Sequence, residues 1–441
     1  MRPSSSPSES LFGALSGSPA VDREVDGAAW LRALLDVERA LAVAQARAGV
    51  LPQAAADQVA AAIDAAGHET AATEAALDPA EIGRRALAAG NPVVPLVAAL
   101  APAAPAIHHG ATSQDVLDTA AGLVAYRAMG LILGDLTESA ARLADLAAAH
   151  RDTVRIGRTL GQPAVPTTFG LMCAGWLVAI EEAADRLRAV RETRLAVQFG
   201  GAAGTLAAAP HPEVVDLLAA ELGLTAPVLP WHTDRTRIAE LAAALGTVAG
   251  VLGKIALDVI LSEGEVAEGT GGGSSTMPHK RNPVRAILVR AAAIRAPGLV
   301  ATLLAAMPQE HERAAGGWHA EWEPLTDLLR IVGGAAAHAR ELLAGLRVDA
   351  ARMRANLDAA GGRPMAENVA GRLAAALGRA AANDLVARLA REPGPFREAL
   401  LADPTVRAHL DEAAVDEALD PVRYLGVAGE FVDRVLRKGS R

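Results

Sequence analysis

A glycine-rich stretch that runs into a short polar motif contains the residues best suited to chemistry. Residues 271–284 read GGGSSTMPHKRNPV, so Ser274 and Ser275 follow the glycines, and Lys280 and Asn282 lie two positions apart between prolines. Glycine leaves the backbone free to adopt conformations that other residues avoid. A serine with an ammonium and an amide fits carbon-acid chemistry beside a carboxylate, where one group moves a proton and donors hold the enolate-like oxygens. The alternative is a flexible Gly/Ser linker that ends in a basic patch.

This motif resembles the signature loop of the fumarase/aspartase superfamily, which includes adenylosuccinate and argininosuccinate lyases. HHGATSQDVLDTA at 108–120 and GRTLGQPAVPTTFG at 157–170 are similar to the superfamily's first and second active-site segments. The segments most similar to 3-carboxy-cis,cis-muconate cycloisomerase are FGGAAGTLA at 199–207, PWHTDRTRIAEL at 230–241 and QEHERAAGGWHAEW at 309–322.

The resemblance implies roles for the residues of the signature loop. Ser274 matches the serine that exchanges a proton with the carbon next to a carboxylate, and Ser275 is its neighbour that helps to shape the loop. Lys280 and Asn282 match the pair that holds the carboxylate as it takes on enolate character. Arg281 is a candidate substrate-binding residue, with a solvated surface arginine as its alternative.

The other two segments supply candidate carboxylate-binding residues by the same resemblance. Thr112 and Ser113 match residues that bind a substrate carboxylate, and they also suit the N-cap of a long helix, which is itself an anion site. His108 aligns with a histidine at the active-site edge, although a structural role fits it equally well. Arg158 and Thr159 align with the second segment and are candidates to bind a second carboxylate. Trp318, with its neighbours His319 and Trp322, fits packing better than chemistry.

Two residues that the lyases of this superfamily use for acid catalysis are absent. Adenylosuccinate lyase and fumarase carry a histidine after the threonine of the second segment, and a glutamate that supports it follows the signature lysine. Here these positions hold Leu160 and Ile287. A leaving amine or hydroxide needs a general acid, whereas a carboxylate, whose conjugate acid has a pKa of ~4, departs as the anion. The reaction therefore involves a weakly basic leaving group or, in reverse, an attacking carboxylate.

These residues and the resemblance together predict an intramolecular lyase that converts 3-carboxy-cis,cis-muconate to 4-carboxymuconolactone. The resemblance implies that this is a step in protocatechuate breakdown and that it needs no metal or organic cofactor. One alternative is a β-elimination lyase that forms fumarate from a substituted succinate with a weakly basic leaving group, such as nitrosuccinate. Another is an adenylosuccinate-lyase-like enzyme with a relocated acid. A non-catalytic family member, like the lens crystallins, fits poorly because Ser274, Lys280 and Asn282 are all present.

Composition limits the partners. The net charge is −9 and no run of Lys or Arg occurs, which argues against nucleic acid, so an anionic substrate needs a local cationic site. The single cysteine, Cys173, excludes an intrachain disulfide and is expected to be buried and inert. The polar N-terminus, residues 1–10, reads as a disordered tail. Uncharged stretches at 86–107 and 159–180 contain prolines that would break a membrane-spanning helix, so we expect a cytoplasmic protein with no membrane partner.

The pattern of apolar residues indicates an all-α fold. Hydrophobic residues make up 51% of the chain and aromatic residues only 3%, which favours closely packed helices of Ala and Leu. Strand signals are weak throughout. We expect three helical domains, 1–108, 109–345 with the signature loop, and 346–441. The resemblance further implies a homotetramer with a twenty-helix core and active sites shared between chains. Helical periodicity predicts helices over 26–48, 53–66, 113–150, 167–196, 234–262, 284–306 and 322–345, and short helices beyond 346.

Overall fold

The computed structural model describes residues 11–67, 77–262, 264–269, 272–273, 277 and 280–439. The predicted tail at 1–10 lies outside this range. The chain divides into two compact units. The first unit comprises Met1–Thr137, Glu182–Ala256 and Arg285–Arg340, and the second comprises Glu138–Glu181, Leu257–Val284 and Glu341–Arg441. The division into three domains stays a prediction.

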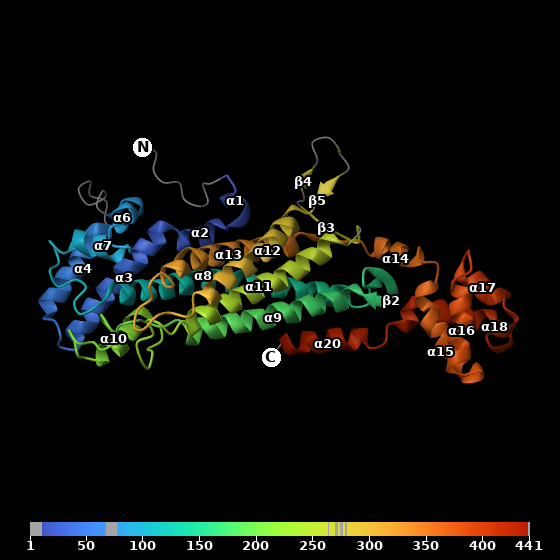
Figure 1. The fold of residues 1–441 in the computed structure, drawn as a ribbon. Coiled ribbons are helices and arrows are strands. Elements are labelled where there is room, and N and C mark those ends of the chain that lie inside the picture. Colours follow the sequence, from blue (N-terminus) through green and yellow to red (C-terminus); the bar gives the residue numbers. More distant parts are fainter. Residues whose placement is uncertain are drawn as a thin grey trace. The chain divides into compact units, whose positions relative to one another are not determined.

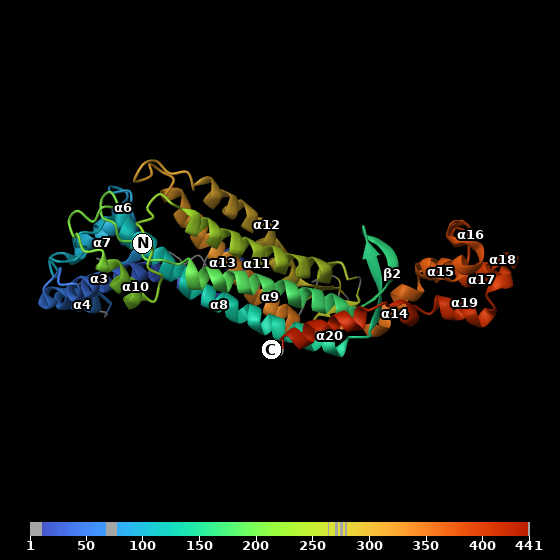
Figure 2. The same cartoon turned by 90° about the horizontal axis from the view of Figure 1, so that it is seen from below.

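Five long helices confirm the all-α class. Each begins and ends within three residues of the range that helical periodicity predicts, because Ala and Leu favour helix and recur at a spacing that forms an apolar face. The parts of these helices that belong to the first unit run side by side (Figures 1 and 2). They are α8 (Ser113–Ala149), α9 (Phe169–Thr193), α11 (Thr236–Ile260), α12 (Val284–Ala305) and α13 (Trp322–Ala344).

Shorter helices complete the first unit. The helix α3 begins where the Asp26 carboxylate accepts a hydrogen bond from the backbone N–H of Ala29 at 2.8 Å, a typical N-cap. Leu41 of α3 packs with Phe199 and Leu218 in one buried cluster. The helices are α1 (Gly13–Ser16), α2 (Pro19–Val25), α3 (Gly27–Arg47), α4 (Gln53–Gly67), α6 (Pro79–Ala86), α7 (Val93–Leu100), α10 (Glu213–Leu222) and the 3-10 helix η2 (His319–Glu321).

The second unit contains a β-hairpin that the weak strand signals did not predict. Strands β1 (Val154–Thr159) and β2 (Gln162–Thr168) pair in antiparallel fashion, with Leu160 and Gly161 at the turn. The hairpin occupies most of the second active-site segment, so the predicted helix at 167–196 was wrong at its start, and α9 begins at Phe169. Two prolines and a register irregularity between Ile156 and Arg158 hide the alternation that marks a longer strand.

Two further strand pairs involve the segment that carries the signature loop, one of them within the loop itself. The strand β3 (Val266–Glu268) pairs with β6 (Leu346–Val348), and β4 (Gly272–Gly273) pairs with β5 (Arg281–Asn282). Beyond β6 the chain forms short helices, as predicted. They are α14 (Ala350–Asp358), η3 (Arg363–Met365), α15 (Ala366–Leu377), α16 (Arg379–Ala390), α17 (Phe396–Ala402), α18 (Pro404–His409), α19 (Glu412–Leu419), η4 (Pro421–Tyr424) and α20 (Ala428–Gly439).

Three of the described helices, α8, α11 and α12, are long and apolar enough to cross a membrane by length and composition alone. In the most apolar window of each, the share buried within the chain is 61%, 50% and 22%, respectively. Most of the apolar window of α12 is therefore not buried by the described residues of the chain.

Candidate active site

The loop before α8 is held by one buried carboxylate. Asp115 Oδ2 accepts the backbone N–H of Thr112 at 3.0 Å, while the Asp115 N–H donates to the Thr112 carbonyl at 3.0 Å, in the manner of a capping box. The same carboxylate accepts the N–H groups of Gly200 and Gly201 at 3.0 and 2.9 Å, and its Oδ1 lies 2.7 Å from His232 Nε2. Asp115 thus fixes Thr112 against the segments 199–207 and 230–241.

Two glycines permit this close packing. Gly110 has φ +70°, and a Cβ at this position would lie 2.7 Å from the Ala209 Cβ. A Cβ at Gly200 would lie 2.7 Å from the Pro230 Cβ and 2.9 Å from His232 Cε1. A larger residue at either position would move the loop that carries Thr112 and Ser113, both of which are half-buried.

His108 is bound to a buried glutamate. Its Nδ1 lies 2.6 Å from Glu38 Oε1, and its backbone N–H donates to Glu38 Oε2 at 3.0 Å. Burial alone would lower the pKa of His108, but the hydrogen bond and charge of Glu38, with the charge of Asp115, outweigh it and raise the pKa. The structure thus gives the imidazole a structural partner and an increased tendency to carry a proton. His108 has φ 60°, a conformation uncommon for a non-glycine residue.

A second buried network of hydrogen bonds and ion pairs holds the segment 309–322 against α8 and the N-terminal end of α11. The Arg235 guanidinium donates to Asp118 at 2.8 and 3.1 Å and to Glu321 at 2.6 to 3.2 Å. Burial opposes the charge of Arg235, but the two carboxylates outweigh it and raise its pKa above the usual range. Trp318 is buried and donates from Nε1 to Asp118 Oδ1 at 3.0 Å, and its ring packs edge-on against Trp322. This segment packs the first unit, as expected.

In the second unit, the hairpin arginines meet a buried glutamate. Arg158 Nη2 donates to Glu265 Oε1 at 2.9 Å, and Arg155 Nε donates to Glu265 Oε2 at 3.2 Å. Asn356 of α14 adds a third hydrogen bond, to Glu265 Oε1 at 3.0 Å. Burial would raise the pKa of Glu265, but these donors and the two positive charges lower it overall. Glu265 therefore stays ionised and holds the guanidinium of Arg158 in place.

The tip of the same hairpin is exposed. Thr159 ends β1 with its side chain in solvent, and Leu160 is fully exposed with φ 52°. A left-handed conformation is costly for leucine, and Gly161 with φ 75° completes a two-residue turn. Position 160, where the resemblance implies the loss of a general-acid histidine, is thus in an accessible, strained turn. Ile287, the other replaced position, lies exposed on α12.

The described part of the signature loop is a narrow strand pair. Asn282 is the register partner of Gly272, and Arg281 is the partner of Gly273. The Lys280 N–H donates to the Met277 carbonyl at 3.0 Å. Lys280 and Arg281 are exposed and Asn282 is half-buried. Ser274 and Ser275, the predicted proton donor and its neighbour, lie outside the described residues.

The predicted site residues fall into two groups. His108, Thr112 and Ser113 lie together in the first unit, whereas Arg158, Thr159, Lys280, Arg281 and Asn282 belong to the second. Sequence reasoning missed four supporting residues. Glu38, Asp115 and Glu265 bind His108, Thr112 and Arg158, respectively, and His232 binds Asp115. A signal existed for two of them, because Asp115 stands three residues after Thr112 and Glu265 stands just before β3 and the signature loop.

The single cysteine is buried, and its burial makes the thiol unreactive. Cys173 is completely buried, which raises its pKa to about 12 despite the nearby charges of Arg155 and Arg142. A thiol in this state is a poor nucleophile. Among the described residues, no group of three or more His, Cys, Asp or Glu side chains could hold a metal ion.

Comparison with known proteins identifies the class. Residues 5–298 match the family described as Lyase, and residues 362–435 match the adenylosuccinate lyase C-terminus. The chain belongs to this lyase family, within the fumarase/aspartase superfamily.

Individual relatives are similar over nearly the whole chain. The 3-carboxy-cis,cis-muconate cycloisomerase of Pseudomonas aeruginosa is 45% identical, and the alignment covers 92% of this chain and 91% of the relative's length. Nitrosuccinate lyase of Streptomyces davaonensis is 46% identical, with coverages of 95% and 92%. The crystal structure of the 3-carboxy-cis,cis-muconate lactonizing enzyme from Pseudomonas putida superposes with a TM-score of 0.88 at 42% identity, over 98% of this chain and 99% of that one.

Proposed function

We propose that this protein is an intramolecular lyase that converts 3-carboxy-cis,cis-muconate to 4-carboxymuconolactone in the β-ketoadipate pathway of protocatechuate degradation. The observation that carries the proposal is the replacement of the general-acid pair by Leu160 and Ile287, while Lys280 and Asn282 are kept. Relatives that bear the cycloisomerase name, at 45%, 43% and 44% identity, support it.

The reaction needs one proton delivered to carbon. The substrate's own carboxylate oxygen attacks the conjugated double bond, a C–O bond forms, and the electron pair moves toward a second carboxylate, which becomes enolate-like. Lys280 and Asn282 donate to those oxygens, where donors are worth most because the charge grows in the transition state. Ser274 passes its hydroxyl proton to the adjacent carbon and regains a proton from solvent. The attacking carboxylate is already ionised at neutral pH, so no base is needed.

The remaining candidates bind the other negative charges of this tricarboxylate. Thr112 and Ser113 lie at the N-terminus of α8, where backbone N–H groups attract anions. His108 and Arg158 are each positioned by a buried carboxylate, Glu38 and Glu265 respectively, and they supply N–H donors for a substrate carboxylate. Thr159, Ser275 and Arg281 complete the proposed substrate-binding set. These groups account for the chemistry without a metal or organic cofactor.

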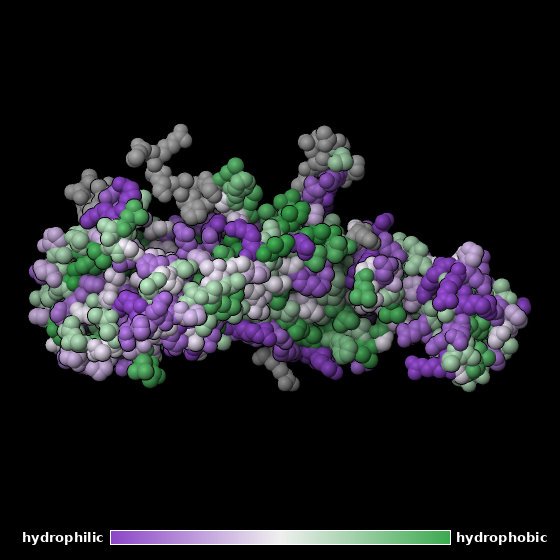
Figure 3. Space-filling model, in the orientation of Figure 1, coloured by the Kyte–Doolittle hydropathy of each residue, from purple (hydrophilic) through white to green (hydrophobic). Residues whose placement is uncertain are grey.

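We also propose a cytoplasmic homotetramer whose active sites are shared between chains, with no nucleic-acid or membrane partner. The apolar side chains of α12 support it, because Ile287, Ile294 and Leu304 are 48%, 66% and 45% exposed and Figure 3 shows apolar surface in this region. Such surface is unfavourable in water and fits contact with other copies. Lipid is a poorer fit, because Arg285, Arg290 and Arg295 recur along the helix and charges are costly in a bilayer.

The function is tested by incubating the purified protein with 3-carboxy-cis,cis-muconate and following loss of the diene absorbance. We expect turnover in the wild type and near-complete loss in Ser274→Ala. A Ser274→Ala variant that kept wild-type turnover would remove the proposed donor, and an inactive wild type would remove the proposed substrate.

A second candidate is nitrosuccinate lyase activity, which the 46% identical relative favours. Nitrite is also a weakly basic leaving group, so the loss of the histidine at position 160 suits it equally well. Parallel assays of nitrite and fumarate release from nitrosuccinate separate the two. A kcat/KM that is higher for nitrosuccinate than for 3-carboxy-cis,cis-muconate would establish nitrosuccinate lyase as the main activity.

The shared site is tested by mixing two inactive variants. Thr112→Val and Lys280→Met alter different segments, so mixed tetramers would regain activity at sites that draw both segments from unaltered chains. Ser274→Ala mixed with Lys280→Met is the matched control, because both changes lie on one loop and every site then keeps a defect. Light scattering in detergent-free buffer checks the tetramer. Equal recovery in both mixtures, or a monomer with full activity, would contradict the arrangement.

A further inference from the structure

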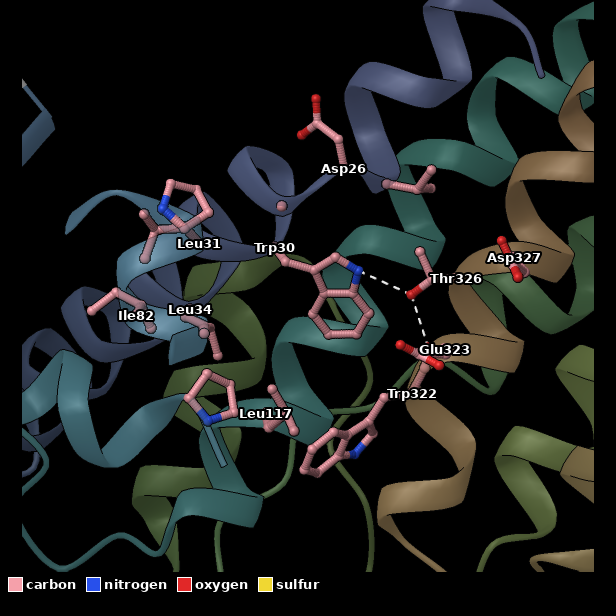
Figure 4. Close-up of a pocket in the computed structure, with 15 residues that line it drawn as sticks. Asp26, Trp30, Leu31, Leu34, Ile82, Leu117, Trp322, Glu323, Thr326 and Asp327 are labelled. Carbon is pink, nitrogen blue, oxygen red and sulfur yellow. Dashed lines mark hydrogen bonds between the residues drawn. The ribbon is translucent and has the colours of Figure 1, made fainter. Parts of the chain in front are cut away.

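The first unit contains a cavity of about 530 Å³ that the proposed reaction does not use. Side chains from α3, α6, α8 and α13 line it (Figure 4). This volume lies in the range of small-molecule binding sites, ~300–1,000 Å³. None of the predicted active-site residues is among its lining residues.

Two indoles and several aliphatic side chains form the walls. Figure 4 shows Trp30 between the aliphatic residues of α3 and α6 and the polar residues of α13, with Trp322 and Leu117 below it. Trp30 Nε1 donates to Thr326 Oγ1 at 3.1 Å, and Thr326 Oγ1 donates to the Trp322 carbonyl at 2.8 Å. This chain of hydrogen bonds fixes the Trp30 ring before any ligand arrives.

The charged side chains that line the cavity are all negative, and the nearest paired cation, Arg330, is not a lining residue. Asp26, Glu323 and Asp327 are lining residues, and none of the described lining residues is a lysine, arginine or histidine. Glu323 is exposed in the first turn of α13. Asp26 Oδ1 accepts the N–H of Ala29, and Asp327 pairs with Arg330 at 3.2 Å. A polycarboxylate would be repelled here, so the cavity does not suit the proposed substrate.

We propose that this cavity is a binding site for a small organic cation with a flat apolar body, such as an aryl-alkyl ammonium. An ammonium group gains from an indole face and from nearby carboxylates, and the apolar body fills the aliphatic part of the cavity. The site has the opposite charge preference from the active site, so the proposal stands whichever anionic substrate the enzyme uses.

The probe is benzyltrimethylammonium, titrated into the whole purified protein and followed by calorimetry and tryptophan fluorescence. Phenylacetate and benzyl alcohol serve as anionic and neutral probes of similar shape. We expect saturable binding of the cation, at least about tenfold tighter than either control probe, and weaker binding as salt is added.

Two kinds of variant locate the binding. Glu323→Gln is expected to weaken cation binding about two- to fivefold, as for a solvent-exposed ion pair. Glu398→Gln is its control, because Glu398 is also an exposed first-turn glutamate, but it belongs to α17 of the second unit and does not line the cavity. Trp30→Leu should weaken binding more than Trp30→Phe, since phenylalanine keeps an aromatic face and both lose the Nε1 donor. If Trp30→Leu does not fold, Trp30→Phe and Glu323→Gln carry the test.

The proposal is overturned by equal affinity for the three probes. It is also overturned by cation binding that Glu323→Gln and Trp30→Phe leave unchanged. Absence of saturable cation binding overturns it too, including the case in which a second copy of the chain fills the cavity.

Discussion

The guanidinium of Arg158 and the buried carboxylate of Glu265 are joined by a 2.9 Å hydrogen bond, although 107 positions separate them in the chain. Glu265 directly precedes β3 and lies at the start of the segment that carries Lys280 and Asn282. The contact therefore links the hairpin of the second active-site segment to the base of the signature loop.

Replacing Glu265 by glutamine should impair both stability and catalysis. We expect a loss of about 1.5–3 kcal/mol in unfolding free energy at pH 7, the usual value of a hydrogen bond to a charged group. The kcat/KM should fall about tenfold or more, because Arg158 loses its fixed position. Urea unfolding and steady-state kinetics measure the two effects. Glu430→Gln, an exposed first-turn glutamate in α20, is the control and should change neither.

The same variant gives a pH dependence of known sign. The pKa of Glu265 is lowered in the folded chain, so its stabilisation is present above the unfolded value of ~4.3 and is lost as the pH falls through the folded value. The difference in stability between wild type and Glu265→Gln should therefore shrink in acid. A difference that stayed constant from pH 7 to pH 3 would mean that the ionised form is not the stabilising one.

The His108–Glu38 pair should give the opposite dependence. The pKa of His108 is raised, so its stabilisation is complete below the unfolded value of ~6.5 and is lost as the pH rises through the folded value. We expect wild-type stability to decline above about pH 6.5 relative to Glu38→Gln, measured by urea unfolding at closely spaced pH values. Parallel curves for the two proteins would show that the pair does not titrate in this range.

Lys280→Met should abolish most of the rate without unfolding the protein. Loss of one donor to a developing oxyanion typically costs about a hundred- to a thousandfold in kcat. Because Lys280 is exposed, the change in unfolding free energy should stay within about 0.5 kcal/mol. Lys438→Met, at an exposed position in α20, is the matched control. A Lys280→Met enzyme with near-normal kcat would exclude the lysine from enolate stabilisation.

Substitutions at Leu160 distinguish its effect on the stability of the hairpin turn from its effect on catalysis. Asparagine adopts positive φ more easily than leucine, so Leu160→Asn should leave the hairpin intact or stabilise it by about 1 kcal/mol. A fall in kcat/KM for this variant would then reflect loss of the apolar side chain. Leu160→His should not speed lactonisation, because a carboxylate nucleophile needs no acid or base. A large gain on adding the histidine would refute the proposed mechanism, and progress curves of diene loss are sufficient to detect it.

The long helices were predictable because their signal is local. In α8, apolar residues recur at helical spacing over 37 residues without a proline, so its limits could be read from the sequence to within one residue. The hairpin at 154–168 was not predictable in this way. Its strands are short, β2 contains Pro163 and Pro166, and pairing across the turn stabilises the strands more than any propensity of their own.

The candidate site also has a part that a local sequence signal predicts and a part that depends on contacts between distant segments. The sequence by itself was enough to find the signature motif, because Lys280 and Asn282 lie two positions apart in the chain. An ammonium and an amide at this spacing predict donors to an enolate-like carboxylate. Tertiary structure decided their supporting partners, because His232 reaches Asp115 across 117 positions and Glu265 reaches Arg158 across 107. A buried charge needs a hydrogen-bonding partner, but which residue supplies it depends on packing that brings distant segments together.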